Sequence, residues 1–453
     1  MRNAGPSARR WLDRLPGGVE ADLREVHERW FTMRFANGRV HQPHVEEERA
    51  LSLRVRVDGR LATATTTDVS VAGFDQLARS AIAMARAAPP EPKFPGFPDD
   101  SVRPPARTIP APARPVPLSV AGRLAADALD GARAELPAAR VSGAVNVGTI
   151  SVAVANTSGL DRTMRRSVGQ ASVLAEDLGS SPPASGWSEG AVWDPRRLPA
   201  RRLGRTAAER VARAPSRSLP PGRYSVLLRA PAVSELLSFL SYLGFSANGE
   251  LQGWSCLARH RDRRIAPSFV NLVDDGTSPR VLPQAIDFEG LGKSRLPLIE
   301  DGYARGPAID LVSGGRLGRA STGHAPPPES PFGESGPSPN QLILAPGDAR
   351  EEEMIRSIRR GVLVTRFHYV RVVHAARSIL TGMTRDGTYL IENGEVTAPV
   401  RNLRFTESIL GTLRGIELVG SVAERTADER GSIAVNCGPV VSRSFRFTSA
   451  TVF

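Results

Sequence analysis

One stretch of the sequence contains the residue types that bind transition metals. In "HQPHVEEE", His41 and His44 stand beside three glutamates, and imidazole and carboxylate groups are common zinc ligands. Two histidines three residues apart converge on one face of a helix, but Pro43 lies between them in a strand-like stretch. The pattern therefore favours a polar strand face over a metal site.

A second stretch, "GWSEG", has the G-x-S-x-G spacing of a nucleophile elbow around Ser188. An elbow serine requires a buried strand before it and a helix after it, and here "SSPPAS" precedes it and "AVWDP" follows it. These flanks predict a loop serine and not a nucleophile.

Three further residues have reactive side chains. His368 and His374 share a face if their segment is a strand, but at about 3.3 Å per residue they stand roughly 20 Å apart, too far to share one ion. Either could still contact a substrate or partner. Cys437 has no histidine near it in sequence and is expected to be a small buried hydrophobe, although folding could bring a partner to it. A catalytic role for His368, His374 or Cys437 is left open.

Complete catalytic motifs are absent from the sequence. There is no G-x-x-x-x-G-K-[ST] loop, no G-x-G-x-x-G after a strand and no H-E-x-x-H. By motif alone, the residues predict no active site.

The composition indicates a globular protein of the cytoplasm. The 453 residues are 41% hydrophobic, and no apolar run reaches the roughly 18 residues of a membrane helix. Cys256 and Cys437 are too few for a disulfide framework, which fits a reducing compartment. The net charge of +12 comes almost wholly from dispersed arginines, because only Lys93 and Lys293 are lysines. We therefore expect neither a nucleic-acid nor a membrane partner.

Turn signals and hydrophobic periodicity divide the chain into four segments. Antiparallel strands with turns at Asn37-Gly38 and Asp58-Gly59, followed by a helix, are expected in 11–88. The proline-dense segment 89–117 is expected to be an extended connector. Segment 118–217 is expected to hold helices and strands that break at Gly148 and at "NTSG", and segment 219–453 is rich in predicted strands.

The C-terminal half resembles a known family. An "STG" turn, "NQLILAPGD", an acidic helix start, "RRGVLVTRFHYV", "TRDG" and "IENGE" follow one another over more than 100 residues. This series is similar to the C-terminal domain of the TldD/PmbA family, and weaker similarity extends back through "VAVANTSG" and "VRVDGRLATATTTD". The resemblance and the strand pattern together predict an α+β fold: an N-terminal α/β region with an antiparallel sheet, and a strand-rich, barrel-like C-terminal domain.

The resemblance implies a heterodimeric zinc metallopeptidase that acts on small or unfolded peptides. TldD-type chains carry H-E-x-x-x-H on a helix, whereas the corresponding stretch here, "PAVSELLSFLSYLGF", has no histidine and Glu235 as its only acid. The PmbA/TldE branch also lacks the motif, and its chains end on a strand similar to "NCGPVVSRSFRFTS". The resemblance thus implies no metal ligands and no cofactor in this chain, with zinc held by a TldD-like partner.

On this reading the chain is a TldE/PmbA-like subunit that completes the substrate chamber for its partner. If peptide is held by strand addition, backbone groups of 362–373 would bind it, with Arg366, His368 and Tyr369 as side-chain contacts. Two alternatives remain: a stand-alone enzyme recruited to peptide natural-product maturation, and a non-catalytic homodimeric binding module.

Overall fold

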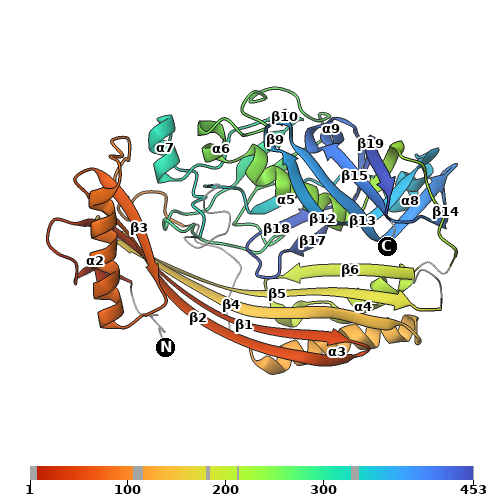
Figure 1. Ribbon diagram of the computed structural model, residues 1–453, viewed down its shortest axis with the longest axis horizontal. Coiled ribbons are helices and arrows are strands. Elements are labelled where there is room, and N and C mark those ends of the chain that lie inside the picture. Colours follow the sequence, from red (N-terminus) through yellow and green to blue (C-terminus); the bar gives the residue numbers. More distant parts are fainter. Residues whose placement is uncertain (1–7, 106–115, 180–183, 212–213, 328–335, 452–453) are drawn as a thin grey trace.

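The computed structural model consists of one long, curved sheet below two strand-rich layers (Figure 1). It describes residues 8–105, 116–179, 184–211, 214–327 and 336–451. The N-terminal half forms the curved sheet, and the C-terminal half forms the layers above it. This mixed arrangement confirms the predicted α+β class.

The curved sheet has six antiparallel strands in the order β3-β2-β1-β4-β5-β6. Two-residue turns join its first three strands at Asn37-Gly38 and Asp58-Gly59, and all four residues have positive φ, as such hairpin turns require. The predicted meander is therefore confirmed. The strands are β1 Glu20–Ala36, β2 Arg39–Val57, β3 Arg60–Thr66, β4 Arg140–Asn156, β5 Asp161–Asp177 and β6 Ala184–Val192.

Helices cover the two ends of this sheet (Figure 1). At one end α3 (Leu118–Glu135) and α4 (Ala200–Glu209) lie against each other, and at the other end α2 (Val71–Ala87) packs on β2 and β3. The contact between α3 and α4 depends on glycine: a Cβ at Gly131 would come within 1.9 Å of a backbone oxygen of α4. The short α1 (Arg9–Leu12) and the 3-10 turn Pro195–Arg197 complete this half.

Two expectations for this half were wrong. Gly148 does not break the strand, because β4 runs through it, and the space of its missing side chain is filled by the ring of Trp30. The segment "GWSEG" is not a loop, because it lies within the edge strand β6. Gly148 pairs with Trp30 of the distant strand β1, and β6 pairs with the preceding strand β5, so in both cases strand pairing outweighs the local turn signal.

The proline-dense segment is described at 89–105 and 116–117, where it contains no helix and only a single bridge, between Pro90 and Arg60. The guanidinium of Arg162 donates to the backbone oxygens of Asp100, Val102 and Arg103 at 2.6 to 3.0 Å. These bonds fasten the described part of the connector to β5.

The second sheet has six strands in the order β10-β9-β8-β11-β18-β17. Only the β11–β18 pairing is parallel. Its strands are β8 Leu272–Asp274, β9 Leu296–Glu300, β10 Tyr303–Ala304, β11 Gln341–Leu344, β17 Glu424–Ala427 and β18 Ala434–Cys437.

The remaining strands form a closed barrel, as expected. The third sheet runs β12-β7-β19-β15-β13-β14, and an additional pairing of β12 with β13 closes five of these strands into a ring. Aromatic rings fill it: Phe367 lies 4.6 Å from Phe405 and 5.8 Å from Phe445 between ring centroids. The strands are β7 Gly222–Leu228, β12 Arg360–His374, β13 Ile379–Glu392, β14 Glu395–Pro399, β15 Leu403–Ser408, β16 Ile416–Val419 and β19 Val440–Ala450, with β16 paired to β19.

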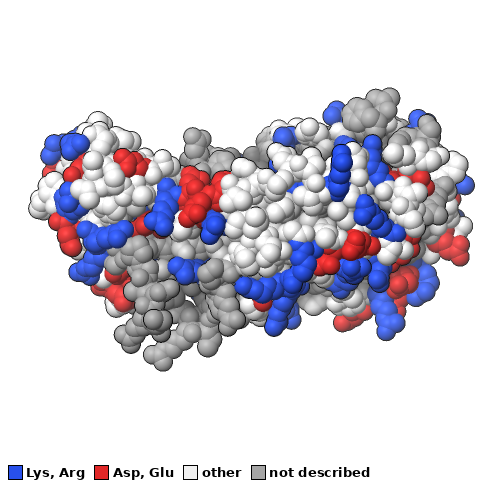
Figure 2. Space-filling model, turned by 90° about the horizontal axis from the view of Figure 1, so that it is seen from below, with Lys and Arg blue, Asp and Glu red and all other residues white. Residues whose placement is uncertain are grey.

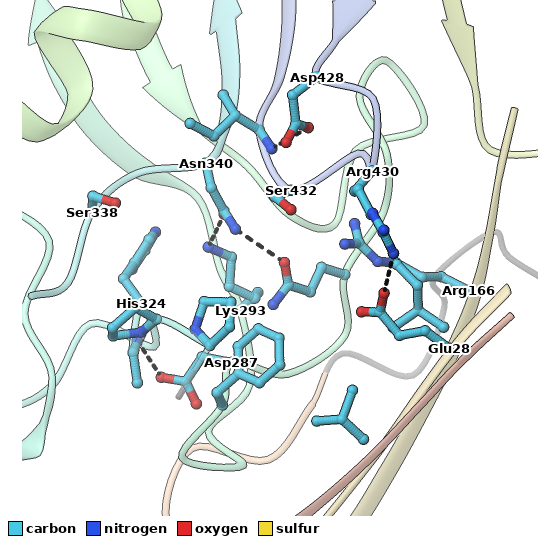
Figure 3. Close-up of a pocket in the computed structure, with 18 of the residues that line it drawn as sticks. Glu28, Arg166, Asp287, Lys293, His324, Ser338, Asn340, Asp428, Arg430 and Ser432 are labelled. Carbon is cyan, nitrogen blue, oxygen red and sulfur yellow. Dashed lines mark hydrogen bonds and ion pairs between the residues drawn. The ribbon is translucent and has the colours of Figure 1, made fainter. Parts of the chain in front are cut away.

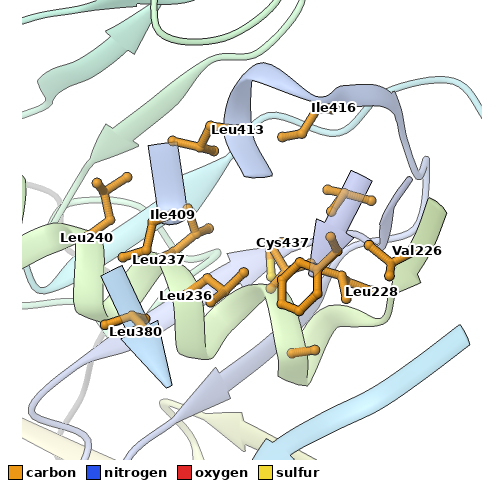
Figure 4. Packing of buried hydrophobic residues seen from close by; sticks show 14 of the residues in the cluster. Val226, Leu228, Leu236, Leu237, Leu240, Leu380, Ile409, Leu413, Ile416 and Cys437 are labelled. Carbon is orange, nitrogen blue, oxygen red and sulfur yellow. The ribbon is translucent and has the colours of Figure 1, made fainter. Parts of the chain in front are cut away.

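Helix α5 (Ala230–Gly244) is buried between the barrel and the second sheet. Figure 4 shows its leucines, Leu236, Leu237 and Leu240, pointing toward β7, β13 and α9. Pro231 occupies its first turn, where the missing N–H has no helical partner to lose. The other elements of this half are α6 Ala247–Leu251, α7 Leu311–Leu317, α8 Glu351–Arg356, the 3-10 turn Ala375–Arg377 and α9 Ile409–Arg414.

Candidate functional site

The curved sheet meets the C-terminal half where β6 contacts β13 of the barrel and β17 of the second sheet. Arg366 of β12 lies at this junction, with its guanidinium carbon 3.9 Å from the ring centroid of Trp187 in β6. Its Nε donates to Asp386 Oδ2 of β13 at 2.8 Å, and Ser185 Oγ of β6 donates to the other oxygen of Asp386 at 2.9 Å. One arginine and one aspartate therefore connect three strands from two sheets.

Two glutamates face the same junction. Burial raises the pKa of Glu189 to about 7 against the opposing charge of Arg366, and the negative charge of Glu235 raises it further. Burial also raises the pKa of Glu235, which Arg366 and Arg371 lower. Glu189 comes from β6 and Glu235 from α5, so the junction holds two carboxyl groups whose pKa values are raised above the ordinary range.

Replacing Glu189 with glutamine is expected to stabilise the protein at pH 8. The folded-state pKa of Glu189 lies above the unfolded value, so its contribution to stability falls as the pH rises from about 4.5 to 7. Because Glu189 is only half-buried, we expect a gain of about 1–2 kcal/mol at pH 8 that disappears below about pH 5. Urea unfolding at pH 8 and below about pH 5 measures this gain in stability. The control is Glu429→Gln, because the side chain of Glu429 is exposed. An equal gain at both values would contradict the assignment.

Cys437 lies against the first residue of helix α5. Cys437 Sγ lies 3.5 Å from the Ala230 carbonyl oxygen, and burial raises the pKa of its thiol, as do the charges of Glu424 and Glu189. A thiol held protonated is a poor nucleophile and metal ligand. Ser234 and Thr426 exchange a hydrogen bond of 2.5 Å beside it. Cys437 is thus buried, as its sequence context predicts.

The three predicted substrate contacts follow one another on β12, beyond the part of this strand that pairs with β7. Arg366 points into the junction, as described. His368 is half-buried, and burial lowers its pKa, as do the charges of Arg385 and Arg366. Tyr369 is 66% exposed with φ of 52°, an unusual conformation for an aromatic residue. His374, at the end of β12, is exposed.

The other candidates do not assemble into a site. His41 and His44 lie on the exposed part of β2, where His44 Nε2 is 3.7 Å from Glu46. Ser188 is buried within β6. In the described ranges, no three His, Cys, Asp or Glu side chains are grouped so that they could hold a metal ion.

Sequence reasoning missed Trp187, Glu189 and Asp386. Trp187 and Glu189 belong to "GWSEG". The proline-rich flank of this segment indicates a loop, but the segment is part of strand β6. Asp386 belongs to "TRDG", one motif of the family resemblance, and no sequence signal joins it to Ser185, 201 positions earlier.

Two parts of the chain match family models. Residues 221–449 match the PmbA/TldA metallopeptidase C-terminal domain, and residues 21–85 match PmbA/TldA metallopeptidase domain 1. The chain belongs to the PmbA/TldD family. This finding confirms the resemblance inferred from the C-terminal motifs.

Solved structures similar to this PmbA/TldD member share its fold over nearly the whole chain. TldE from Thermococcus kodakarensis is 18% identical, with a TM-score of 0.85, covering 97% of this chain and 98% of that one. A protein from Thermotoga maritima described as a modulator of a DNA gyrase is 20% identical, with a TM-score of 0.81, covering 97% and 100%. These identities show the fold alone.

Curated relatives match over about half of their length. A "Metalloprotease" from Methanothermobacter thermautotrophicus is 27% identical over 48% of this chain and 48% of its own. A "Metalloprotease TldD homolog" from Buchnera aphidicola is 24% identical over 46% and 42%, respectively.

The surface charge is mixed on the face viewed from below, where basic and acidic side chains are interleaved (Figure 2). None of the helices in the described ranges combines the length and the hydropathy needed to cross a membrane.

Proposed function

We propose that this PmbA/TldD-family chain is the subunit without zinc in a heterodimeric metallopeptidase, and that it completes the substrate chamber for a TldD-like partner. The observation that carries the proposal is the composition of α5. By the sequence resemblance this helix corresponds to the H-E-x-x-x-H helix of TldD-type chains, and it contains no histidine. Glu235, its only acid, lies near Arg366 and Arg371, whose charges lower its pKa.

The free edge of β12 supports peptide binding by strand addition. On one edge β12 pairs with β13 along most of its length, but on the other it pairs with β7 only from Gly361 to Val364. No other strand in the described ranges pairs with this edge beyond Val364. An unpaired edge offers backbone donors and acceptors to an extended peptide without reading its sequence.

Side chains near that edge fit a contact role. Tyr369 projects into solvent within the register shift between His368 and Arg371. A strained, exposed aromatic residue beside a half-buried histidine is typical of a contact surface. Tyr369 and His368 are the proposed peptide contacts, whereas Arg366 is chiefly engaged by Asp386 and Trp187.

Purification of the tagged chain from its native host, followed by mass spectrometry and zinc analysis, tests the proposal. We expect a near-equimolar partner with H-E-x-x-x-H and about one zinc per pair, a ratio set by a single catalytic site. The separated chain should bind no stoichiometric zinc. Recovery of this chain alone as a homo-oligomer, or of stoichiometric zinc on it, would overturn the assignment and favour a homodimeric module or a stand-alone enzyme.

A further inference from the structure

A separate pocket of about 420 Å³ lies between the curved sheet and loops of the C-terminal half. Figure 3 shows Glu28, Arg166 and Arg430 on one side of it and His324 and Lys293 on the other. None of its lining residues belongs to the junction around Arg366. Its volume is in the range of sites that enclose small molecules.

Arg166 is the cation of this pocket that has no hydrogen-bonded anion in the described ranges. It lies on β5 with its side chain on the pocket side, and it is 7% exposed. Its Nε and Nη1 are buried without a hydrogen bond, and within the described ranges the guanidinium forms no ion pair. An isolated buried charge costs several kcal/mol, so buried guanidinium groups normally have a hydrogen-bonded anion.

The nearby acids do not supply that anion. Glu28 and Asp428 act on Arg166 through charge only. Glu28 accepts a hydrogen bond from Trp30 Nε1 at 2.8 Å, and Asp428 accepts one from the Ile433 backbone N–H at 3.0 Å. Both carboxylates are therefore held by other donors.

The other cations of the pocket are already paired. Lys293 Nζ lies 3.2 Å from Asp274 and donates to Asn340 Oδ1 at 3.0 Å. Arg430 is 2.8 Å from Glu46. One positive charge is left for a ligand, and it belongs to Arg166.

The residues that line the pocket restrict the chemical class of ligand that can bind. Acidic side chains at Glu28, Glu48 and Asp428 surround the pocket and would repel a dianion such as phosphate. Apolar groups, including Ile150, Phe288 and Ile433, make up much of the wall. The chemistry that fits is one carboxylate on an apolar body.

We propose that this pocket binds a small apolar monocarboxylate, with its carboxylate at the pocket-facing edge of the Arg166 guanidinium. The carboxylate would supply the charge partner that the fold leaves out, and the apolar body would lie against Phe288 and Ile433. A free carboxylic acid and the carboxyl end of a short peptide share this chemistry. The site is independent of the role proposed for the Arg366 junction.

Titration calorimetry of the full chain with N-acetyl-L-leucine tests the proposal. The neutral analogue N-acetyl-L-leucinamide should bind at least about tenfold more weakly, because it lacks the charge that Arg166 requires, and tenfold corresponds to about 1.4 kcal/mol. Inorganic phosphate should bind no better than the amide. An acetylated tripeptide ending in leucine distinguishes the two sources: tighter binding than N-acetyl-L-leucine indicates a peptide end, and weaker binding indicates a free acid.

Variants locate the site. Arg166→Met should lower the affinity for N-acetyl-L-leucine about tenfold or more without loss of folding, because it removes an unpaired buried charge. Arg165→Met is the matched control: its side chain is exposed, one position earlier on the same strand, and binding should be unchanged. Equal binding of acid and amide by the wild-type chain, which requires no variant, would overturn the proposal. So would an unchanged affinity in Arg166→Met, or no binding at about 10 mM ligand.

Discussion

Asp274→Asn should destabilise the protein by about 3–5 kcal/mol, because it removes the charge that balances a fully buried lysine. The Asp274 side chain is inaccessible, and its Oδ1 faces Lys293 Nζ at 3.2 Å and His324 Nε2 at 2.9 Å. Its Oδ2 accepts the backbone N–H groups of Asn340 and Gln341 at 2.6 and 2.7 Å. The asparagine side chain can retain only some of these hydrogen bonds and carries no charge to pair with Lys293.

The double variant Asp274→Asn, Lys293→Met separates lost charge balance from lost packing. It should recover more than about 1 kcal/mol relative to Asp274→Asn, since no uncompensated charge stays buried. Asp58→Asn, in an exposed turn that accepts asparagine, should change the free energy of unfolding by less than about 0.5 kcal/mol. Urea unfolding followed by tryptophan fluorescence gives these values. If the double variant were no more stable than the single one, the charge argument would fail.

The buried carboxylate of Asp274 also predicts that the stability of the protein depends on pH. Burial alone would raise the pKa of Asp274, but Lys293 and His324 hold it well below its ordinary range. A carboxyl with a depressed folded-state pKa stabilises the fold above the unfolded pKa of about 3.9, and this contribution is lost as the pH falls further. The difference in the free energy of unfolding between the wild-type protein and Asp274→Asn should therefore become smaller below about pH 4.

Local signals predicted much of the fold. The sequence predicts the Asn37-Gly38 and Asp58-Gly59 turns correctly, because short-range backbone preferences determine them. The sequence series from "STG" to "IENGE" identified the family, and the family resemblance in turn predicted the barrel.

The buried cluster around Asp274 and the junction around Arg366 could not be predicted from the sequence, because each is assembled from segments that are distant in sequence. Asp274 and His324 are 50 positions apart, and Ser185 and Asp386 are 201 apart. Arg166 looks like any strand arginine until the curved sheet and the C-terminal loops close around it. Periodicity reports which face of a strand a residue occupies, but not which other element covers that face.

The Arg366 junction gives the second large effect. Arg366→Met should cost about 2–4 kcal/mol, because it leaves the buried carboxylate of Asp386 with Ser185 as a donor and only Arg385, at 4.0 Å, as a cation, and removes the stacking on Trp187. Adding Asp386→Asn should recover more than about 1 kcal/mol, since asparagine accepts the φ of 52° at this position and carries no charge. Arg385→Met, on a more exposed side chain 4.0 Å from Asp386, is the matched control and should cost less than about 0.5 kcal/mol.

This prediction also divides the three proposed contacts by role. If Arg366 holds β6 to the barrel, its loss lowers stability first, whereas His368→Ala and Tyr369→Ala leave stability within about 0.5 kcal/mol and act only on peptide cleavage by the reconstituted pair. A half-buried histidine and an exposed tyrosine near an unpaired strand edge can be removed without opening the core. Should Arg366→Met instead keep full stability and raise KM for peptide, Arg366 would be a substrate contact and the junction would be open to peptide. The stability and the KM of this one variant therefore decide between a structural clamp and a binding surface.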